Sequence, residues 1–300
     1  MAGQALVVVV PARNEEARLP LCLASLAAQS RVELRVLVSD NASSDATATV
    51  ARAATAELDL VLRTVDPVGP SAHFVSAMRW ALGSSDAEVF ALLAGDDTWQ
   101  PGFAAAALEV LVRSPEVDVV FPRFVWEGGG VERTLPAAAF RQASAAARQR
   151  AALLMPDRRE LSNLVYGVYR RAAFIDLADA WAAGGDEFGA DFAAAWAVLG
   201  GHRVAACDAA VGRRFTRAGA DLLERIGFSR AAATGPVSMM TTYVRVNLAV
   251  NRALALAMRR VSAHPGQPRT VAVQLMRAPQ WLWGALDQVR TVLRRSGQTG

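Results

Sequence analysis

The feature that most constrains the fold is a regular alternation of apolar runs and helical stretches through the first 121 residues. Each run is short and rich in valine and leucine, and each is followed by a segment with helical periodicity. Apolar strands separated by helices of about ten to fifteen residues are typical of βαβ units and a mainly parallel sheet. The sequence therefore predicts an α/β domain whose strands lie at 6–10, 34–40, 58–65, 88–93 and 117–121.

Polar residues directly follow three of these strands, as Arg13-Asn14-Glu15, Asp40-Asn41 and Asp96-Asp97. In parallel sheets, ligands bind beyond the carboxyl ends of the strands. We therefore expect all three sets at one edge of the sheet. The pattern also predicts Asn14 as the cap of a helix that has Glu15 in its first turn.

Composition narrows the class of protein. The chain is 53% apolar and 20% charged, which is globular, and its net charge of +4 is too small and scattered to indicate a nucleic-acid partner. Cys22 and Cys207 lack metal-site spacing and are predicted to be buried thiols. The sequence begins without a signal-peptide pattern and has no uninterrupted apolar run of the ~20 residues that a membrane span needs. These features predict a cytoplasmic protein.

The organisation changes near residue 126. We predict one domain over residues 1–215, with halves at 1–125 and 126–215, followed by a helical region over 216–300. Residues 237–262 and 267–295 read as long amphipathic helices, the second carrying Trp281 and Trp283 beside its apolar stripe. Two interpretations stay open for them: packing or homodimerisation, and peripheral contact with the inner face of a membrane.

Three sets of carboxylates are candidates for chemistry. Asp96 and Asp97 suit magnesium or manganese, which one or two carboxylates plus substrate phosphates usually hold, but Asp97 also suits a helix cap. Asp40 suits either recognition of a nucleobase N–H or a turn in which the residues after it cap the next helix. Asp191 opens a helix, where an aspartate either complements the helix dipole or acts as a general base.

Together these motifs resemble family 2 glycosyltransferases, which are inverting enzymes with the GT-A fold. The resemblance spans roughly residues 5–215 and rests on four segments in the family's order and approximate spacing. They are VVVPARNEEARL at 8–19, LVSDNASSDAT at 37–47, AGDD at 94–97 and GADF at 189–192. The resemblance implies a GT-A-type, Rossmann-like, mainly parallel sheet flanked by helices, with a helical carboxyl-terminal extension.

The resemblance also implies roles for single residues. Asp40, with Asn41 beside it, recognises the base, typically uracil, and Asp191 is the catalytic base. Asp96, with Gly95 and Asp97, meets the diphosphate through Mn²⁺ or Mg²⁺. The base and ribose are lined, largely by main chain, by Pro11, Ala12, Arg13, Asn14 and Glu15.

The implied reaction moves a sugar from a nucleotide-diphosphate sugar to a hydroxyl of a glycan, lipid-linked or small-molecule acceptor, as in the synthesis of cell-surface glycans or glycolipids. Selection of the acceptor is expected from the middle of the chain, including Asn163, Tyr166, Tyr169 and the loop around Trp126. The alternatives are a non-catalytic nucleotide-sugar-binding scaffold and, more weakly, a sugar-phosphate nucleotidyltransferase.

Two positions depart from the family pattern. Ala94 stands where the first aspartate of Asp-x-Asp is expected, which removes half of the usual motif. His73 stands where similar sequences carry asparagine; it either faces the donor site or, as helix histidines more often do, lies on the helix surface or in the core.

Overall fold

A computed structural model describes residues 5–127, 132–133, 144–154, 158–185 and 189–215. Its strands are β1 (Leu6–Ala12), β2 (Leu34–Asp40), β3 (Asp59–Thr64), β4 (Val89–Leu92), β5 (Asp97–Trp99), β6 (Val119–Glu127), β7 (Glu132–Arg133), β8 (Val168–Arg170) and β9 (Val204–Phe215). Its helices are α1 (Leu19–Ala27), α2 (Thr47–Ala53), η1 (Ala54–Ala56), α3 (Pro70–Ser84), α4 (Phe103–Arg113), α6 (Ala145–Leu154), η2 (Arg158–Tyr166), α7 (Arg171–Gly184) and α8 (Ala190–Gly201).

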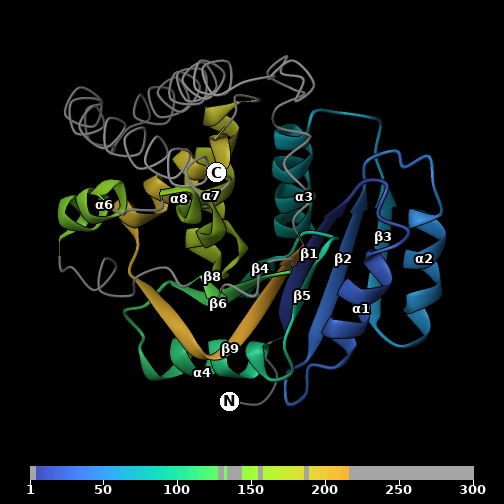
Figure 1. Ribbon diagram of the computed structural model, residues 1–300, viewed down its shortest axis with the longest axis horizontal. Helices are drawn as coiled ribbons and strands as arrows, with labels where there is room; N and C mark the ends of the chain where they lie inside the picture. Colours follow the sequence, from blue (N-terminus) through green and yellow to red (C-terminus); the bar gives the residue numbers. More distant parts are fainter. Residues whose placement is uncertain (1–4, 128–131, 134–143, 155–157, 186–188, 216–300) are drawn as a thin grey trace, which may run out of the picture.

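The strands form one sheet in the order β3-β2-β1-β4-β8-β6-β9-β5, with β7 paired to β6 (Figure 1). β1 pairs in parallel with β2 and β4, β2 with β3, and β6 with β9, whereas β8 is antiparallel to both β4 and β6. β5 closes the other edge, antiparallel to β9. The predicted mainly parallel α/β sheet is confirmed.

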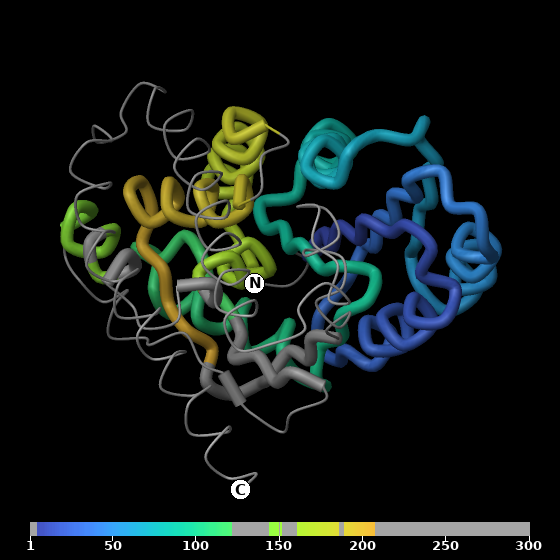
Figure 2. The backbone as a smooth tube through the Cα atoms, turned by 45° about the horizontal axis from the view of Figure 1, so that its top comes forward, coloured from blue at the N-terminus to red at the C-terminus, as the bar shows by residue number. Residues whose placement is uncertain are grey.

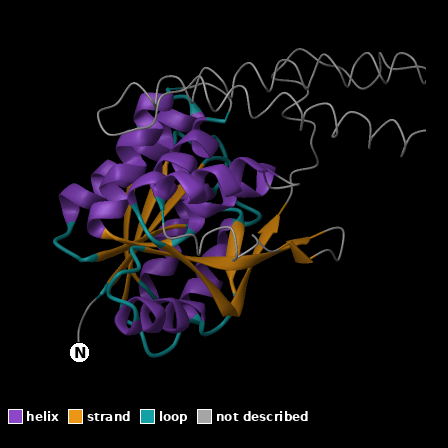
Figure 3. Cartoon of the chain, turned by 90° about the vertical axis from the view of Figure 1, so that its left-hand side faces the viewer, coloured by secondary structure: helices purple, strands orange, loops and turns teal. Residues whose placement is uncertain are grey.

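Helices cover both faces of the sheet (Figure 3). Alternate side chains of β1 enter opposite cores, since Val7 and Val9 join the core beneath α3, α7 and α8 while Val8 and Val10 join the one beneath α1 and α4. Both faces of a parallel sheet are buried in this way, which is why its strands read as continuous apolar runs. Cys22 and Cys207 are buried and free, as predicted.

Three local predictions are wrong in their boundaries. The first helix begins at Leu19, with Arg18 rather than Asn14 as its cap residue. The sequence predicts a helix from about Pro101, but α4 begins at Phe103 because Gly102, at φ 87°, has a left-handed backbone that cannot continue a helix back to Pro101. The sequence also predicts an extended piece over 164–169, whereas residues 164–166 belong to η2 and the extended segment is only β8.

A bent strand, β9, connects β6 to the edge strand β5. β9 pairs with β6 along its length, but its register shifts between Pro122 and Arg123, where residues 208–210 of β9 have no partner. Its second half also pairs with β5, so that Asp97 lies opposite Arg214. The chain therefore runs from α8 through β9 to the side of β5. Figure 2 shows the first part of this path, from α8 into the start of β9, from a second direction.

Candidate functional site

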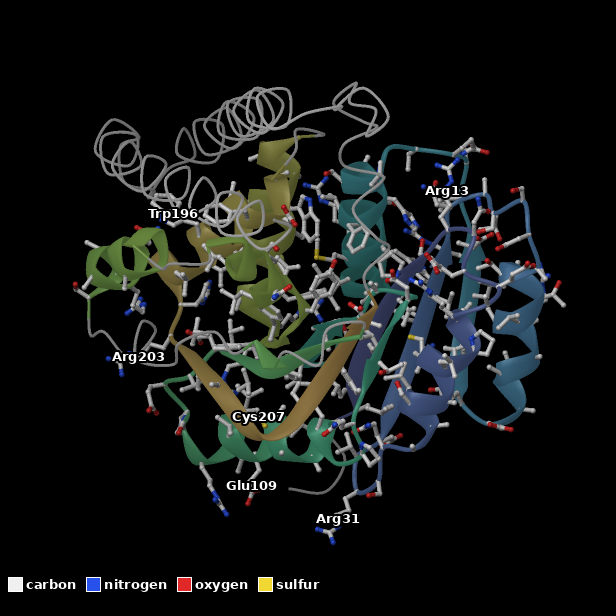
Figure 4. All side chains as sticks on the ribbon, viewed as in Figure 1. Arg13, Arg31, Glu109, Trp196, Arg203 and Cys207 are labelled. Carbon is white, nitrogen blue, oxygen red and sulfur yellow. The ribbon has the colours of Figure 1, made fainter. Side chains whose placement is uncertain are left out.

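The three predicted polar sets do meet at the carboxyl edge of the parallel strands. Ala12 is in register with Asp40, and the Asn41 N–H donates to the Ala12 carbonyl at 3.0 Å. On the other side of β1, the Gly95 N–H donates to the Pro11 carbonyl at 3.1 Å. Figure 4 shows Arg13 at this edge, with Arg31 at the far end of the same layer.

The turns after β1 and β2 interlock through reciprocal hydrogen bonds. The Asn14 N–H donates to Ser43 Oγ at 2.9 Å, and Asn14 Oδ1 in turn accepts from the Ser44 N–H at 2.9 Å. The Glu15 N–H donates to Thr47 Oγ1 at 2.7 Å. Asn14 holds a left-handed backbone, at φ 54°. A cap residue accepts a hydrogen bond from an amide two or three residues after it, whereas Asn14 Oδ1 accepts from Ser44 of the other turn. Asn14 therefore does not cap α1, which begins later than predicted.

The same interlocking continues at Glu16. Its N–H donates to Asp45 Oδ2 at 3.1 Å, and its Oε2 accepts from the Ala46 N–H at 2.9 Å. Asp45 also accepts from the Thr47 N–H at 2.9 Å, but the cap residue of α2 is Ala46, which makes no side-chain cap bond. The prediction that Ser43, Ser44 or Asp45 caps this helix is therefore wrong, and Ser43 bonds to Asp40 instead. Each turn thus provides the polar partners of the other.

Asp40 is buried at the end of β2, with 2% of its surface exposed. Its Oδ1 accepts from both the hydroxyl and the N–H of Ser43. Asn41, equally buried, fixes the loop before α3: its Nδ2 donates to the Val68 carbonyl at 2.9 Å, and its Oδ1 accepts from the Val68 N–H at 3.0 Å. Asp40 therefore helps to build its turn and, through Oδ2, still has an acceptor to offer.

Asp96 and Asp97 differ in their surroundings. Asp96 is partly exposed and lies 3.8 Å from the Arg18 guanidinium, whereas Asp97 is buried within β5. The predicted cap role of Asp97 does not occur, because Gly102 is the cap residue of α4. Gly95 allows the close approach to β1, since a methyl group there would lie 3.1 Å from Ala12 Cβ. The two carboxylates therefore sit against the β1 turn.

Cys22 lies beneath this carboxylate pair. Its Sγ is 3.7 Å from the Ala94 carbonyl oxygen. Burial raises the pKa of the Cys22 thiol well above its usual value, and the negative charges of Asp97 and Asp96 add to the effect. Cys22 is therefore a thiol that packs under the site and not a nucleophile.

His73 lies in the core side of α3, 3% exposed, next to β2. Its Nε2 is 3.1 Å from Ser39 Oγ, which also accepts from Arg63 Nε at 3.1 Å. Burial, and after it the nearby Arg63 charge, lower the pKa of His73 from 6.5 to about 4. The histidine is thus a neutral core residue, the commoner of the two alternatives for this position.

Replacing His73 by asparagine is expected to make the free energy of unfolding depend less on pH between about 6.5 and 4. The folded chain disfavours the His73 proton, so its stabilisation is complete above pH 6.5 and is lost as the pH falls toward about 4. We expect wild type to lose about 2 kcal/mol more unfolding free energy than His73→Asn across that window. Urea unfolding of both proteins at pH 7 and 4.5 measures this, and equal losses would contradict the assignment.

Asp191 lies in the first turn of α8, partly exposed, and its Oδ1 accepts from the Phe192 N–H at 2.7 Å. The cap residue of α8 is Gly189, whose φ of 84° suits glycine. The end of α7 packs directly on this start, since a methyl group on Gly184 would lie 2.9 Å from Ala190 Cβ. Asp186 and Glu187, the other two carboxylates of this segment that the sequence offers as a base, lie outside the described residues.

The expected acceptor residues are less available than the sequence indicates. Tyr169 is wholly buried, with its hydroxyl bonded to the Leu164 carbonyl, and Asn163 and Tyr166 are also buried. The side chain of Trp126, whose loop was also expected to select the acceptor, lies outside the described part. Sequence reasoning missed a cavity of about 650 Å³ across α3 and the end of α7, because its residues come from three distant segments.

A family model for glycosyl transferase family 2 matches residues 7–174, which include β1 through β8 and the three polar turns. The chain belongs to glycosyl transferase family 2. A search of curated protein sequences found no match to this family 2 chain.

Solved structures share the fold of this glycosyltransferase. S. aureus TarS 1-349 in complex with UDP is 19% identical, with a TM-score of 0.56 over 99% of this chain and 92% of that chain. Mannosyltransferase PcManGT from Pyrobaculum calidifontis, in complex with GDP-Man and Mn²⁺, is 18% identical, with a TM-score of 0.51 over 95% of this chain and 86% of that one. The GT-A-type expectation for the fold is thereby confirmed.

Two properties of the described residues bear on metal binding and on membrane insertion. Among the described residues, no group of three or more His, Cys, Asp or Glu side chains is placed to hold a metal. Within the same part of the chain, no helix is long and apolar enough to cross a membrane. The predicted helices at 237–262 and 267–295, with their dimer and membrane alternatives, lie outside the described residues.

Proposed function

We propose that this glycosyltransferase transfers a sugar, with inversion, from a UDP-linked donor to an acceptor hydroxyl. The observation that carries the proposal is the meeting of three polar turns at the carboxyl edge of β1, β2 and β4 in a chain of family 2. Ligands of open α/β sheets bind at such an edge. UDP in the TarS complex, a structure of the same fold, supports the choice of nucleotide.

The base and ribose are proposed to lie over the β1 and β2 turns. Asp40 Oδ2 accepts the base N–H, which a buried carboxylate does strongly. Asn41 holds the loop at Val68 in place, and the backbone from Pro11 through Glu15 forms the floor. Because the interlocked turns satisfy their own amides, this half of the site is formed before the nucleotide arrives.

The carboxylate pair fits a divalent cation that the substrate completes. Mg²⁺ and Mn²⁺ sites commonly use one or two carboxylates and take remaining ligands from phosphates and water, so the lack of a three-ligand group among described residues is expected of such a site. Asp96 would hold the ion, with Asp97 behind it and Arg18 nearby. When bound, the ion neutralises charge on the departing diphosphate.

Asp191 is the proposed general base. Its carboxylate takes the proton from the acceptor hydroxyl, whose oxygen bonds to the anomeric carbon on the face opposite the diphosphate. The bond from that carbon to the diphosphate oxygen breaks, and the nucleoside diphosphate leaves with the electron pair. Its place in the first turn of α8 puts the carboxylate at the positive end of the helix dipole.

Calorimetric titration with UDP, with and without manganese, tests the donor half of the proposal. We expect manganese to tighten UDP binding about tenfold or more, equivalent to about 1.4 kcal/mol, because it bridges carboxylate and diphosphate. A thermal-shift screen of nucleotide sugars in manganese then identifies the donor sugar.

Donor hydrolysis separates the proposal from its main alternative. Slow, manganese-dependent release of UDP from the identified donor supports a transferase, whereas tight donor binding without any release would favour a non-catalytic scaffold. If UDP bound equally well with and without manganese, the proposal that Asp96 holds a metal ion would be wrong. GDP serves as the control nucleotide, because Asp40 is proposed to recognise uracil.

A further inference from the structure

One side of α1 lies against the segment that carries the carboxylate pair. Cys22 Sγ is 3.7 Å from the Ala94 carbonyl oxygen, and Ser25 Oγ accepts from the Trp99 N–H at 3.1 Å. Arg18, the cap residue of α1, has helical backbone angles and lies four positions before Cys22, which puts it on the same side of the helix. The packing of α1 therefore fixes the Arg18 backbone next to the carboxylate pair.

Arg18 and Asp96 form a loose ion pair. Arg18 Nη1 is 3.8 Å from Asp96 Oδ2, which is longer than the ~2.7–2.9 Å of a charge-assisted hydrogen bond. Of the two side chains, 32% of Arg18 and 23% of Asp96 are exposed, so a ligand can reach both groups. Because partly exposed ion pairs contribute little to stability, a stronger partner for either group separates them.

Several carboxylates gather at this end of α1. Burial, and then the negative charges of Asp97, Asp96 and Glu15, raise the pKa of the Cys22 thiol, which places all three carboxylates near that side chain. Arg18 lies beside one of them, Asp96. A divalent cation held by Asp96 and the Arg18 guanidinium would therefore compete for the same carboxylate, because two positive groups this close repel each other.

We infer that Arg18 is a donor-binding residue that changes partners. It pairs with Asp96 before the donor binds, and it binds the diphosphate once a metal ion is on Asp96. A guanidinium matches two phosphate oxygens with parallel hydrogen bonds, which are stronger than its loose contact with Asp96. Arg18 thus weakens metal binding until a nucleotide is present, so that metal and nucleotide bind as a pair. The inference rests on the proposed donor site.

The first test measures the affinity for Mn²⁺ alone, by the electron paramagnetic resonance signal of the free ion. It uses the full chain of wild type, Arg18→Gln and Arg18→Lys, without nucleotide. We expect Arg18→Gln to bind Mn²⁺ about tenfold more tightly than wild type, because the repelling charge is gone. Arg18→Lys keeps that charge and should stay within about threefold of wild type.

The second test measures UDP affinity by calorimetry on the same proteins, without metal and at saturating manganese. We expect Arg18→Gln to bind UDP about tenfold more weakly in both conditions, by loss of the charge-assisted hydrogen bonds to the diphosphate. Arg18→Lys should lose less, since an ammonium keeps the charge without the fork. A variant that merely loosened α1 would weaken both ligands, whereas the inference requires changes in opposite directions.

Arg113→Gln is the matched control. Arg113 pairs with Glu109 on α4 as Arg18 pairs with Asp96, and its removal changes the net charge equally. Figure 4 shows Glu109 far from Arg13, which marks the edge of the sheet where the proposed donor turns lie. Arg113→Gln should match wild type in both titrations.

The outcomes separate the two proposals. Tighter Mn²⁺ binding together with weaker UDP binding in Arg18→Gln alone supports the inference. Manganese-dependent UDP binding that Arg18→Gln leaves unchanged would overturn the inference while the proposed function stands. Equal Mn²⁺ affinity in wild type and Arg18→Gln, or the same changes in Arg113→Gln, would also overturn it. A wild type that binds no UDP, or binds it equally with and without manganese, would overturn the proposed donor site and the inference with it.

Discussion

Replacing Asp191 by asparagine is expected to lower turnover about 10³-fold while leaving the Kd for UDP within about twofold of wild type. The amide keeps the size of the carboxylate, and it cannot take the acceptor proton. The residue lies in the first turn of α8, away from the turns proposed to hold the nucleotide, so donor binding does not depend on its charge. Steady-state transfer and UDP calorimetry on the same preparation measure both quantities.

Asp186→Asn is the comparison variant, because Asp186 is the nearby carboxylate that could replace Asp191 in this role. We expect it to retain turnover within about threefold. Full activity in Asp191→Asn combined with a large loss in Asp186→Asn would transfer the role to Asp186. The pH profile adds a second readout, since removing the base removes the acid limb of turnover that it controls.

Replacing Asp96 by asparagine is expected to abolish the gain in UDP affinity that manganese provides and to lower turnover about 10²-fold. Asp96 is the more exposed of the two carboxylates and already lies 3.8 Å from a cation, Arg18. We therefore expect a metal–diphosphate complex to reach Asp96 rather than the buried Asp97. UDP titrations with and without manganese, and transfer rates at saturating donor, give the two numbers.

Asp59→Asn is the matched control, an exposed aspartate at the start of β3 and so at the opposite edge of the sheet. It should match wild type in UDP affinity and in transfer. If Asp96→Asn retained the full manganese effect on UDP binding, the metal role would pass to Asp97. Thermal melting of each variant separates loss of binding from loss of the fold.

Much of the sheet follows from local sequence. The apolar runs predict β1 through β4 closely, and β2 coincides with the predicted 34–40. Because the carboxyl ends of parallel strands share an edge, the meeting of Asp40 with the Pro11–Glu15 turn also follows from the sequence alone. The roles given to those residues rest on family resemblance and stay predictions.

The remaining features depend on contacts between distant segments. The local sequence around Asn14 predicts a helix cap, but in the structure Asn14 bonds to Ser43 and Ser44. Nothing near Asn14 in the sequence indicates these two partners. β5 is only three residues long and exists because β9 pairs with it. The acceptor expectation for Tyr169 fails because the side chain packs into the core. Local patterns carry no trace of such long-range packing.

Because of the reciprocal bonds between them, the β1 and β2 turns depend on each other and can be replaced only as a pair. A graft of residues 40–47 alone from another enzyme would strand the amides of Asn14, Glu15 and Glu16, whose partners are Ser43, Thr47 and Asp45. The Glu15 amide is the buried one of the three, and leaving it without a partner costs about 1–3 kcal/mol. If these turns bind the donor as proposed, we expect donor preference to be exchanged only when both turns are transplanted together.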